Sequence, residues 1–393
     1  MREFWVAIGL LWLAGASLRL TVLAVPPVIA LIQADLDLSG TEIGFLSGLP
    51  VILFGVAALP GSLLIARFGA LSTLVAGLLI AALASGLRGA LLDVGVLYAA
   101  TVVMSAGIAV MQPALPPLIQ QWTPRRVTFG TAACTNGLLV GETLAVMLTI
   151  PLLPLLDGSW RAAFAVWGIP LLVTAILTVL LAPAPKPDAV ARPPAAARSS
   201  WWPDWRNKLV WQLGILFGSV NSSYFAVNAF LPGHLAGAGR SDLIAGALTA
   251  INFGQVPASF VMLAVAGRLE RRAWPLILCG ALMLLCLGGI AATADVWTVV
   301  FAGVLGFLGA FVLTIGFALP ALLSAPADVA RMSAAMFTIS YSEGLVIAVL
   351  SGAAWDLGGS PRFAFVPMAL ALLPLLVVPA TIAFRRPRDA AAR

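Results

Sequence analysis

Residues 158–164 read Gly-Ser-Trp-Arg-Ala-Ala-Phe, and residues 359–365 read Gly-Ser-Pro-Arg-Phe-Ala-Phe. The two stretches lie 201 positions apart, counted from the first glycine of one to the first glycine of the other. Self-similarity at a fixed spacing indicates that the second half of the chain duplicates the first. The same shift aligns two further pairs, Arg67 with Arg268 and Glu142 with Glu343.

The rest of the chain has the composition of a membrane protein. Of its 393 residues, 61% are hydrophobic and 10% are charged, whereas soluble domains carry about 25% charged residues. The apolar residues form continuous runs, which excludes a β-barrel, whose strands alternate, and also a disordered chain. We therefore expect an all-α membrane protein.

Apolar runs long enough to cross a bilayer recur along the whole sequence. A hydrocarbon core about 30 Å thick requires about 20 apolar residues per helix. Charges and turn residues divide the sequence into twelve such segments, which the repeat groups into two parallel sets of six. The predicted transmembrane helices are 4–31, 43–66, 70–91, 95–120, 129–156, 160–182, 208–233, 242–266, 273–293, 296–322, 331–355 and 362–384.

The single long connection predicts the domain boundaries. Residues 183–207 are rich in Pro, Ala and Arg, a composition typical of a linker between domains. We expect an N-terminal six-helix bundle over residues 1–182 and a C-terminal six-helix bundle over residues 208–393.

Basic residues are distributed unequally over the predicted loops. Seventeen of the 22 Lys and Arg residues lie on the side of the termini and the linker, and four lie on the other side. Cytoplasmic loops carry the excess of Lys and Arg, so we expect both termini in the cytoplasm. The net charge of +6 then reflects topology and requires no nucleic-acid partner. The four basic residues assigned to outer loops are Arg88, Arg161, Arg240 and Arg362.

Three ionisable residues, Arg19, Glu142 and Glu343, lie near the middle of predicted helices. An unpaired charge at the bilayer centre costs about 2.5–3.5 kcal/mol, so such residues face a cavity or a partner and mark functional sites by default. A buried ion pair that only locks helices together is the alternative. The repeat places Arg19 on Val220, so we expect an asymmetric site on a duplicated scaffold.

Neutral polar side chains accompany these charges. Any one of them is explained as well by a hydrogen bond between helices, worth about 0.6 kcal/mol, as by contact with a substrate. As a cluster they predict a polar substrate site at the midplane between the halves. The candidate substrate-binding residues, besides Arg19, are Asn136, Asn221, Tyr224, Asn228 and Tyr341. His234, beside Pro232 and Gly233, is predicted to be a solvated residue of an outer loop.

The sequence contains neither a Ser/His/Asp nor a Cys/His constellation, and its three cysteines lack metal-ligand spacing. We therefore expect no enzyme activity, no cofactor and no metal. A phosphate-binding G-x-x-x-x-G-K-[ST] loop is also absent, so energy for transport would come from an ion or solute gradient. Glu142 and Glu343 are candidates for proton coupling, because a carboxylate removed from water has a raised pKa, or for binding a cation.

Two loops stand at equivalent places in the halves: residues 61–71, Gly-Ser-Leu-Leu-Ile-Ala-Arg-Phe-Gly-Ala-Leu, and residues 267–272, Gly-Arg-Leu-Glu-Arg-Arg. With the two sets of six helices and the central linker, they resemble the major facilitator superfamily, whose loop between helices two and three usually reads G-x-L-x-D-R-x-G-R-R. The resemblance covers essentially the whole chain and implies the major facilitator fold. It also implies that Arg67, Gly69 and Arg268 belong to the gating loops.

Within that superfamily the chain is similar to the branch of cyanate permeases and 2-nitroimidazole exporters. The resemblance implies a monomeric secondary transporter of the cell inner membrane that moves a small polar solute by alternating access. Arg19 matches the arginine in the first helix of that branch and would suit a small anion, whereas small uncharged residues are expected at Glu142 and Glu343. The similar pieces are Leu18-Arg19, residues 48–51 (Gly-Leu-Pro-Val), Phe54-Gly55, residues 115–119 (Leu-Pro-Pro-Leu-Ile), Ser159-Trp160-Arg161, Tyr224 and Leu231-Pro232.

Three hypotheses of function remain open at this point. In the first, the chain transports a small polar or anionic organic solute such as a cyanate-like anion, coupled to protons. In the second, the two glutamates bind a cationic amine or a neutral heterocycle for export, and Arg19 is a structural counter-ion. In the third, the chain keeps the fold but acts as a membrane sensor that transports nothing.

Overall fold

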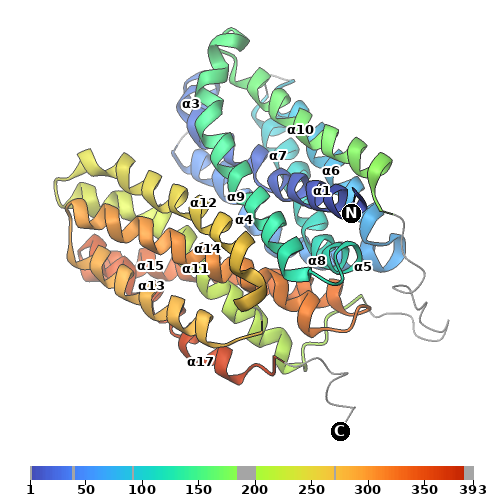
Figure 1. The fold of residues 1–393 in the computed structure, drawn as a ribbon. Coiled ribbons are helices and arrows are strands. Elements are labelled where there is room, and N and C mark those ends of the chain that lie inside the picture. Colours follow the sequence, from blue (N-terminus) through green and yellow to red (C-terminus); the bar gives the residue numbers. More distant parts are fainter. Residues whose placement is uncertain (1, 38–39, 91–92, 184–200, 270, 385–393) are drawn as a thin grey trace. The chain divides into compact units, whose positions relative to one another are not determined.

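The structure, a computed structural model, describes residues 2–37, 40–90, 93–183, 201–269 and 271–384 and is helical throughout (Figure 1). It divides into two compact units. The N-terminal unit comprises Met1–Pro203 and Pro326–Ala334, and the C-terminal unit comprises Asp204–Ala325 and Ala335–Arg393. Most of the predicted linker, residues 184–200, lies outside the described residues.

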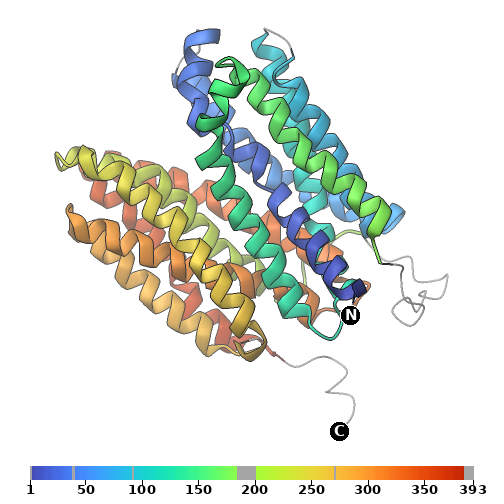
Figure 2. The ribbon, with the colours of Figure 1, turned by 45° about the horizontal axis from the view of Figure 1, so that its top comes forward.

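The N-terminal unit is a bundle in which α1 packs on α9, α6 packs on α7 and α10, and α4 packs on α7. Figures 1 and 2 show α1 and α9 side by side along much of their length. The elements of this unit are α1 (Arg2–Ser17), α2 (Leu20–Leu23), η1 (Pro26–Val28), α3 (Ile29–Leu36), α4 (Gly40–Val56), α5 (Ala58–Phe68), α6 (Ala70–Leu87), α7 (Val94–Met111), η2 (Gln112–Ala114), α8 (Leu115–Trp122), α9 (Val127–Leu152), η3 (Leu153–Leu156) and α10 (Trp160–Leu181).

In the C-terminal unit α14 packs on α11, α12 and α13, while α16 and α17 pack on α11 and α13. The elements are α11 (Lys208–Gly237), η5 (Ser241–Leu243), α12 (Ile244–Leu269), α13 (Trp274–Ala292), α14 (Val296–Leu323), α15 (Val329–Gly358), η6 (Pro361–Ala364), α16 (Phe365–Leu372) and α17 (Pro374–Thr381). The division into units places the first residues of α15, up to Ala334, with the N-terminal unit.

The described helices confirm the predicted all-α membrane fold. Ten spans are long and apolar enough to cross a bilayer, and the bent pair Leu49–Val56 and Ala58–Phe68, which meet at 48°, forms an eleventh. Helix α11 is a further helix of 30 residues, which is long enough to cross. Its Asn and Ser residues reduce its mean hydropathy, so it is not among the ten spans identified by length and apolar composition.

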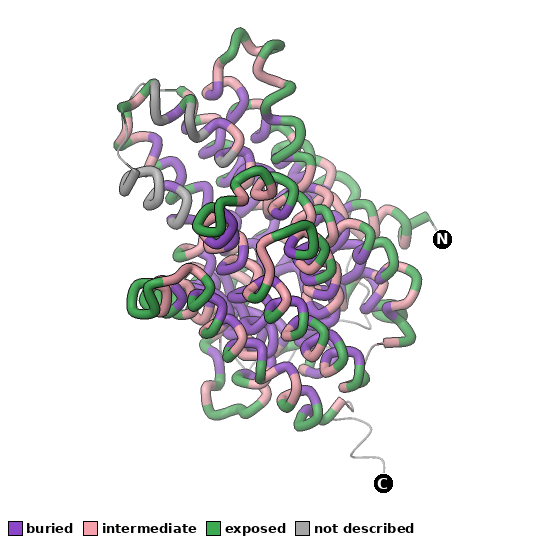
Figure 3. The backbone as a smooth tube through the Cα atoms, turned by 90° about the vertical axis from the view of Figure 1, so that its left-hand side faces the viewer, coloured by how far each residue is buried: buried purple, intermediate pink, exposed green. Residues whose placement is uncertain are grey.

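Buried and exposed residues alternate along the helices, as the tube in Figure 3 shows. The exposed faces nevertheless carry large apolar side chains, for example Leu83 of α6 at 64% exposure and Leu180 of α10 at 71%. Such faces would be costly in water and are expected where lipid covers the helix.

The first predicted helix, 4–31, is broken into four pieces. Leu18 and Arg19 donate their N–H groups to carbonyls three residues earlier, Gly15 and Ala16, which ends α1 in a tighter turn. Shortly afterwards Pro26 and Pro27 lack N–H donors, and the chain continues through η1 into α3. The sequence located the prolines, but the break begins at Leu18, eight residues before the first of them.

The repeat is visible in the turns. Gly158 and Gly359, which the shift of 201 aligns, both adopt positive φ, at 74° and 64°. This conformation favours glycine. After the first of these glycines Ser159 caps α10 by accepting the N–H of Ala162 at 3.1 Å, while after the second the chain enters the short helix η6.

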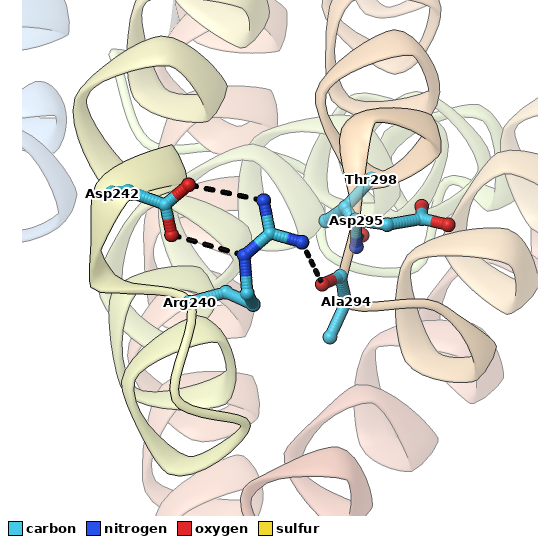
Figure 4. Close-up of polar contacts among 5 residues, drawn as sticks. All are labelled: Arg240, Asp242, Ala294, Asp295 and Thr298. Carbon is cyan, nitrogen blue, oxygen red and sulfur yellow. Dashed lines mark hydrogen bonds and ion pairs between the residues drawn. The ribbon is translucent and has the colours of Figure 1, made fainter.

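Polar contacts also fix the loops. In the C-terminal unit the guanidinium group of Arg240 donates two hydrogen bonds to Asp242, both at 3.0 Å, and a third to the carbonyl of Ala294 at 3.5 Å (Figure 4). The next residue, Asp295, begins α14 as one half of a capping box with Thr298. Arg240 therefore ties the end of α11 to the start of α14.

Candidate functional site

Helices α1 and α9 of the N-terminal unit meet backbone to backbone, because glycines form their contact. A β-carbon added to Gly137 would collide with the carbonyl of Trp12, and one added to Gly141 would lie 2.6 Å from the carbonyl oxygen of Ala16. Since both contacts advance by four residues on each helix, α1 and α9 run parallel. Small residues allow such close approach in membrane helices.

Three of the predicted site residues lie along this pair of helices. Arg19 follows Ala16 by three residues and Glu142 follows Gly141 by one, so both lie within about one helical turn, 5.4 Å, of the contact. Asn136 lies six residues before Glu142 on α9, where its side-chain oxygen accepts the indole N–H of Trp12 at 2.7 Å.

Arg19 stands at the break of the first span. Its φ and ψ of −123° and −23° are not helical, and its carbonyl accepts the N–H groups of both Val22 and Leu23. The half-buried guanidinium group lies over the ring of Phe54 of α4, 5.2 Å from the ring centre. Such a contact is a cation–π interaction that compensates part of the cost of burying the charge. Glu142 is 7% exposed and is also buried in this unit.

In the C-terminal unit two of the predicted residues join one hydrogen-bonded cluster. Tyr224 donates its hydroxyl proton to the side-chain oxygen of Asn252, and Asn252 donates to Asn228 at 2.9 Å. Asn228 closes the ring by donating to the backbone carbonyl of Tyr224 at 2.9 Å. All three residues are half-buried, so this cluster of α11 and α12 is partly accessible.

Glu343 of α15 lies against α11. Its carboxylate accepts a hydrogen bond from the Ser222 hydroxyl, and a β-carbon on Gly218 would collide with one of its oxygens. One turn earlier on α15, Ser340 accepts a hydrogen bond from Asn221 at 2.8 Å. The predicted residues Asn221 and Glu343 therefore both lie at the contact between α11 and α15.

Tyr341 of α15 is buried among aromatic rings. It is 3% exposed and its ring stacks on that of Phe337, with ring centres 6.4 Å apart. Phe337 in turn contacts Phe217 and Phe317. Tyr341 is thus part of an aromatic cluster in the core of the C-terminal unit.

The predicted gating residues end helices on the surface. Arg67 lies in the last turn of α5 and Arg268 in the last turn of α12, and both are exposed. Positive charge at a helix C-terminus is favourable. Gly69 connects α5 to α6 with φ of 84°, a conformation that side chains with a β-carbon rarely adopt.

His234 is not a solvated loop residue, contrary to the prediction. Helix α11 continues through Pro232 and Gly233 to Gly237, and His234 is 9% exposed. Its Nε2 lies 2.8 Å from the carbonyl oxygen of Thr293, and its ring meets that of Phe365 edge to face. The prediction took Pro-Gly as a helix end, but proline is tolerated within membrane helices.

Arg88 was assigned to an outer loop from the sequence, but it is 1% exposed. Its guanidinium group lies over the ring of Phe164 at 4.1 Å and donates to the carbonyl of Thr21 at 3.0 Å. A signal was present in the sequence, since Arg88 is the only charged residue between Arg67 and Asp93.

Comparison with known proteins places this architecture in a family. The family model of the Major Facilitator Superfamily matches residues 11–252. The chain is 25% identical over 356 residues to the uncharacterized transporter YycB of Bacillus subtilis, covering 89% of this chain and 85% of that one. It is 24% identical to the cyanate transport protein CynX of Escherichia coli, covering 66% of each chain. It is 26% identical to the 2-nitroimidazole transporter of Escherichia coli, covering 61% and 60%.

Among solved structures, the outward conformation of the transporter FucP superposes with a TM-score of 0.72 at 13% identity, covering 96% of this chain and 98% of that one. This likeness concerns the fold, and it agrees with the family match. The predicted resemblance to the branch of cyanate and 2-nitroimidazole transporters is confirmed at low identity. The chain belongs to the Major Facilitator Superfamily and is a multi-pass membrane transporter of that kind.

Proposed function

We propose that this chain is a proton-coupled secondary transporter of a small polar or anionic organic solute, such as a cyanate-like anion, and that it works by alternating access. The observation that carries the proposal is the position of Arg19 at the break of the first span. A broken membrane helix frees backbone groups that can bind a solute. Arginine adds a fixed positive charge and planar donors suited to a carboxylate-like anion.

We propose that the remaining substrate contacts come from the polar residues that the sequence predicts for the substrate site. Asn136 in the N-terminal unit and Asn221, Tyr224 and Asn228 in the C-terminal unit offer amide and hydroxyl groups. Tyr341 belongs to the proposed set too, but its ring is buried against Phe337, so the solute would reach only its hydroxyl end. Solute sites combine an apolar lining with a few placed polar groups of this kind.

Proton coupling is assigned to the two glutamates. Glu142 is buried and follows Gly141, which contacts the turn of α1 that precedes Arg19. Glu343 accepts a hydrogen bond from the Ser222 hydroxyl. A carboxyl group removed from water is favoured in its neutral, protonated form. Uptake of a proton by one of these groups would therefore accompany movement of the solute.

Several further features are part of the proposal. The bundles are assigned to residues 1–182 and 208–393 with the linker at 183–207, and Arg67, Gly69 and Arg268 are assigned to the gating loops. We assign the chain to the cell inner membrane from its resemblance to the family, and both termini to the cytoplasm from the distribution of Lys and Arg. The names of two relatives, a cyanate and a 2-nitroimidazole transporter, agree with a small solute.

The second candidate is export of an amine or a neutral heterocycle. It is favoured by the two carboxylates at membrane depth, which could hold an ammonium group, with Arg19 as a structural cation. The two candidates differ in the charge of the solute, so a binding experiment separates them.

Binding is tested by thermal unfolding of the detergent-solubilised protein with cyanate, formate, nitroimidazoles and alkylamines. A ligand present at a hundred times its dissociation constant stabilises the folded state by about 2.7 kcal/mol. We expect cyanate to stabilise the wild type but not Arg19→Ala, while Arg240→Lys, which keeps the charge in a surface loop of the C-terminal unit, behaves as the wild type. Stabilisation by amines alone, abolished by Glu142→Gln or Glu343→Gln, would reject the anion hypothesis.

A further inference from the structure

Arg88 lies in the interior of the N-terminal unit, at the end of α6. It is 1% exposed, and the three ion pairs found among the described residues do not include it. Its neighbours come from three other elements: Thr21 of α2, Met104 of α7 and Phe164 of α10. A full positive charge is thus enclosed by groups that carry no negative charge.

Only one of the three nitrogen atoms of the Arg88 guanidinium group makes hydrogen bonds. Nη1 donates to the carbonyl oxygen of Thr21 at 3.0 Å and contacts the sulfur of Met104 at 3.2 Å. The other two nitrogens, Nε and Nη2, are buried and have no hydrogen-bond partner. In arginine the N–H bonds of Nε and Nη2 point the same way along one edge, which is the edge that binds carboxylates and oxyanions through two parallel hydrogen bonds.

The surroundings hold this edge in place. Phe164 faces the guanidinium group at 4.1 Å and is itself fixed, since its carbonyl accepts the Ser85 hydroxyl at 2.7 Å and its ring meets that of Trp160. The next residue, Gly89, lies against the backbone of Arg161 so closely that a β-carbon would collide with it. The unpartnered edge is therefore buried among closely packed groups that fix the guanidinium group.

Thr21 contributes a second unpartnered group to the same neighbourhood. Its hydroxyl oxygen is buried without a hydrogen-bond partner. Its carbonyl is available to Arg88 because the N–H of Val25, which would donate to it in a regular helix, donates to the carbonyl of Val22 instead. Buried polar groups are almost always satisfied, so three unpartnered atoms on the residue pair Arg88 and Thr21 point to a bound partner.

We propose that the Nε and Nη2 edge of Arg88 binds a small carboxylate or oxyanion inside the N-terminal unit, at a site separate from the one assigned to Arg19. Water could satisfy the two N–H groups but would leave the charge unbalanced. The cation–π contact with Phe164 compensates the charge only in part. An anion supplies both the acceptors and the counter-charge, and it joins α6 to the broken first span through the bond from Arg88 to Thr21.

The test uses the purified full-length protein in detergent with formate and nitrate as probes and chloride at the same ionic strength as reference. Formate or nitrate is expected to raise Tm above the chloride value in the wild type. Arg88→Lys keeps the charge but loses the parallel donors, so this difference should disappear. Arg19→Lys should retain it.

Hydrogen exchange of the wild type keeps the proposal testable if Arg88→Lys does not fold. Formate should slow exchange in peptides covering α2 and the end of α6 relative to chloride. Equal Tm and equal exchange in formate and chloride would overturn the proposal. Loss of the formate effect in Arg19→Lys, with its retention in Arg88→Lys, would assign the anion to Arg19 and would also overturn it.

Discussion

Gly141 of α9 lies against the backbone of Ala16 of α1: a β-carbon on Gly141 would lie 2.6 Å from the carbonyl oxygen and 2.7 Å from the Cα atom of Ala16. Both atoms belong to the backbone of a helix, so they cannot move aside as a flexible side chain can. The contact sets the distance between α1 and α9 and holds Arg19 and Glu142 at one level of the N-terminal unit.

Gly141→Ala should therefore reduce the free energy of unfolding by about 1–3 kcal/mol, the usual cost of overpacking a close contact. Gly9→Ala in α1 is the matched control, because no atom lies within 4 Å of the added carbon there. In the control the better helix propensity of alanine predicts a gain of up to about 1 kcal/mol. Thermal unfolding in detergent measures both, and equal effects would show that the helices are not held by this contact.

Asn252 is the centre of the cluster that includes Tyr224 and Asn228. Asn252→Leu removes the acceptor of the Tyr224 hydroxyl and the donor to Asn228, and a lost hydrogen bond of a partly buried group costs about 1 kcal/mol. We expect a lower Tm and weaker solute binding, measured in the same ligand panel.

The control for this change is Thr314→Val in α14. The Thr314 hydroxyl donates to the carbonyl of Ala310 in its own helix at 2.8 Å, so its loss should leave solute binding unaltered. If Asn252→Leu lowers Tm but binds every solute as the wild type does, the cluster is structural and Tyr224 and Asn228 do not contact the solute.

Asp35, beyond the end of the first span, receives hydrogen bonds from Arg161 and Trp160. The bond from Arg161, followed by that from Trp160, lowers the pKa of Asp35 below its ordinary value. A carboxyl with a lowered folded-state pKa contributes stability above its unfolded pKa of about 3.9 and loses it as the pH falls through the folded value.

Asp35→Asn should therefore reduce Tm slightly at neutral pH, and the difference from the wild type should shrink below about pH 4. The effect is small because the ion pair is partly exposed, on the side of Asp35 above all. Asp37→Asn provides a control on a neighbouring exposed residue whose positive φ asparagine tolerates. A difference between Asp35→Asn and wild type that stays constant with pH would contradict this assignment.

Glu343→Gln should uncouple solute movement from protons. The amide keeps the size of the side chain and a polar contact to Ser222, but it cannot release a proton. We expect exchange of solute across liposomes to persist while accumulation driven by a pH gradient disappears, and the same comparison applies to Glu142→Gln. Wild-type transport that does not depend on pH would contradict proton coupling.

The sequence was sufficient for the membrane fold and the family, because both depend on long apolar runs and on the repeat. The turn glycines Gly158 and Gly359 illustrate this, since the aligned positions share a backbone conformation. The sequence also indicated that helices end near Arg67, Gly69 and Arg268, as they do in the structure.

Features that depend on tertiary packing were beyond the sequence. Arg88 is buried because Thr21 and Phe164, which are 67 and 76 positions away in the chain, enclose it. His234 is buried because α11 passes through Pro232 without ending. The break at Arg19 begins before the prolines that signal it, since the tight turn involves Leu18 and Arg19.

Transport by the purified protein in liposomes tests the central claim most directly. With an inward proton gradient, labelled cyanate and other small organic anions are compared with an alkylamine, using wild type, Arg19→Ala and Arg240→Lys. The account predicts saturable anion uptake that Arg19→Ala abolishes and Arg240→Lys retains. Movement of the amine alone, or anion uptake that is unchanged in Arg19→Ala, would contradict it, and movement of no solute at all would favour a sensor.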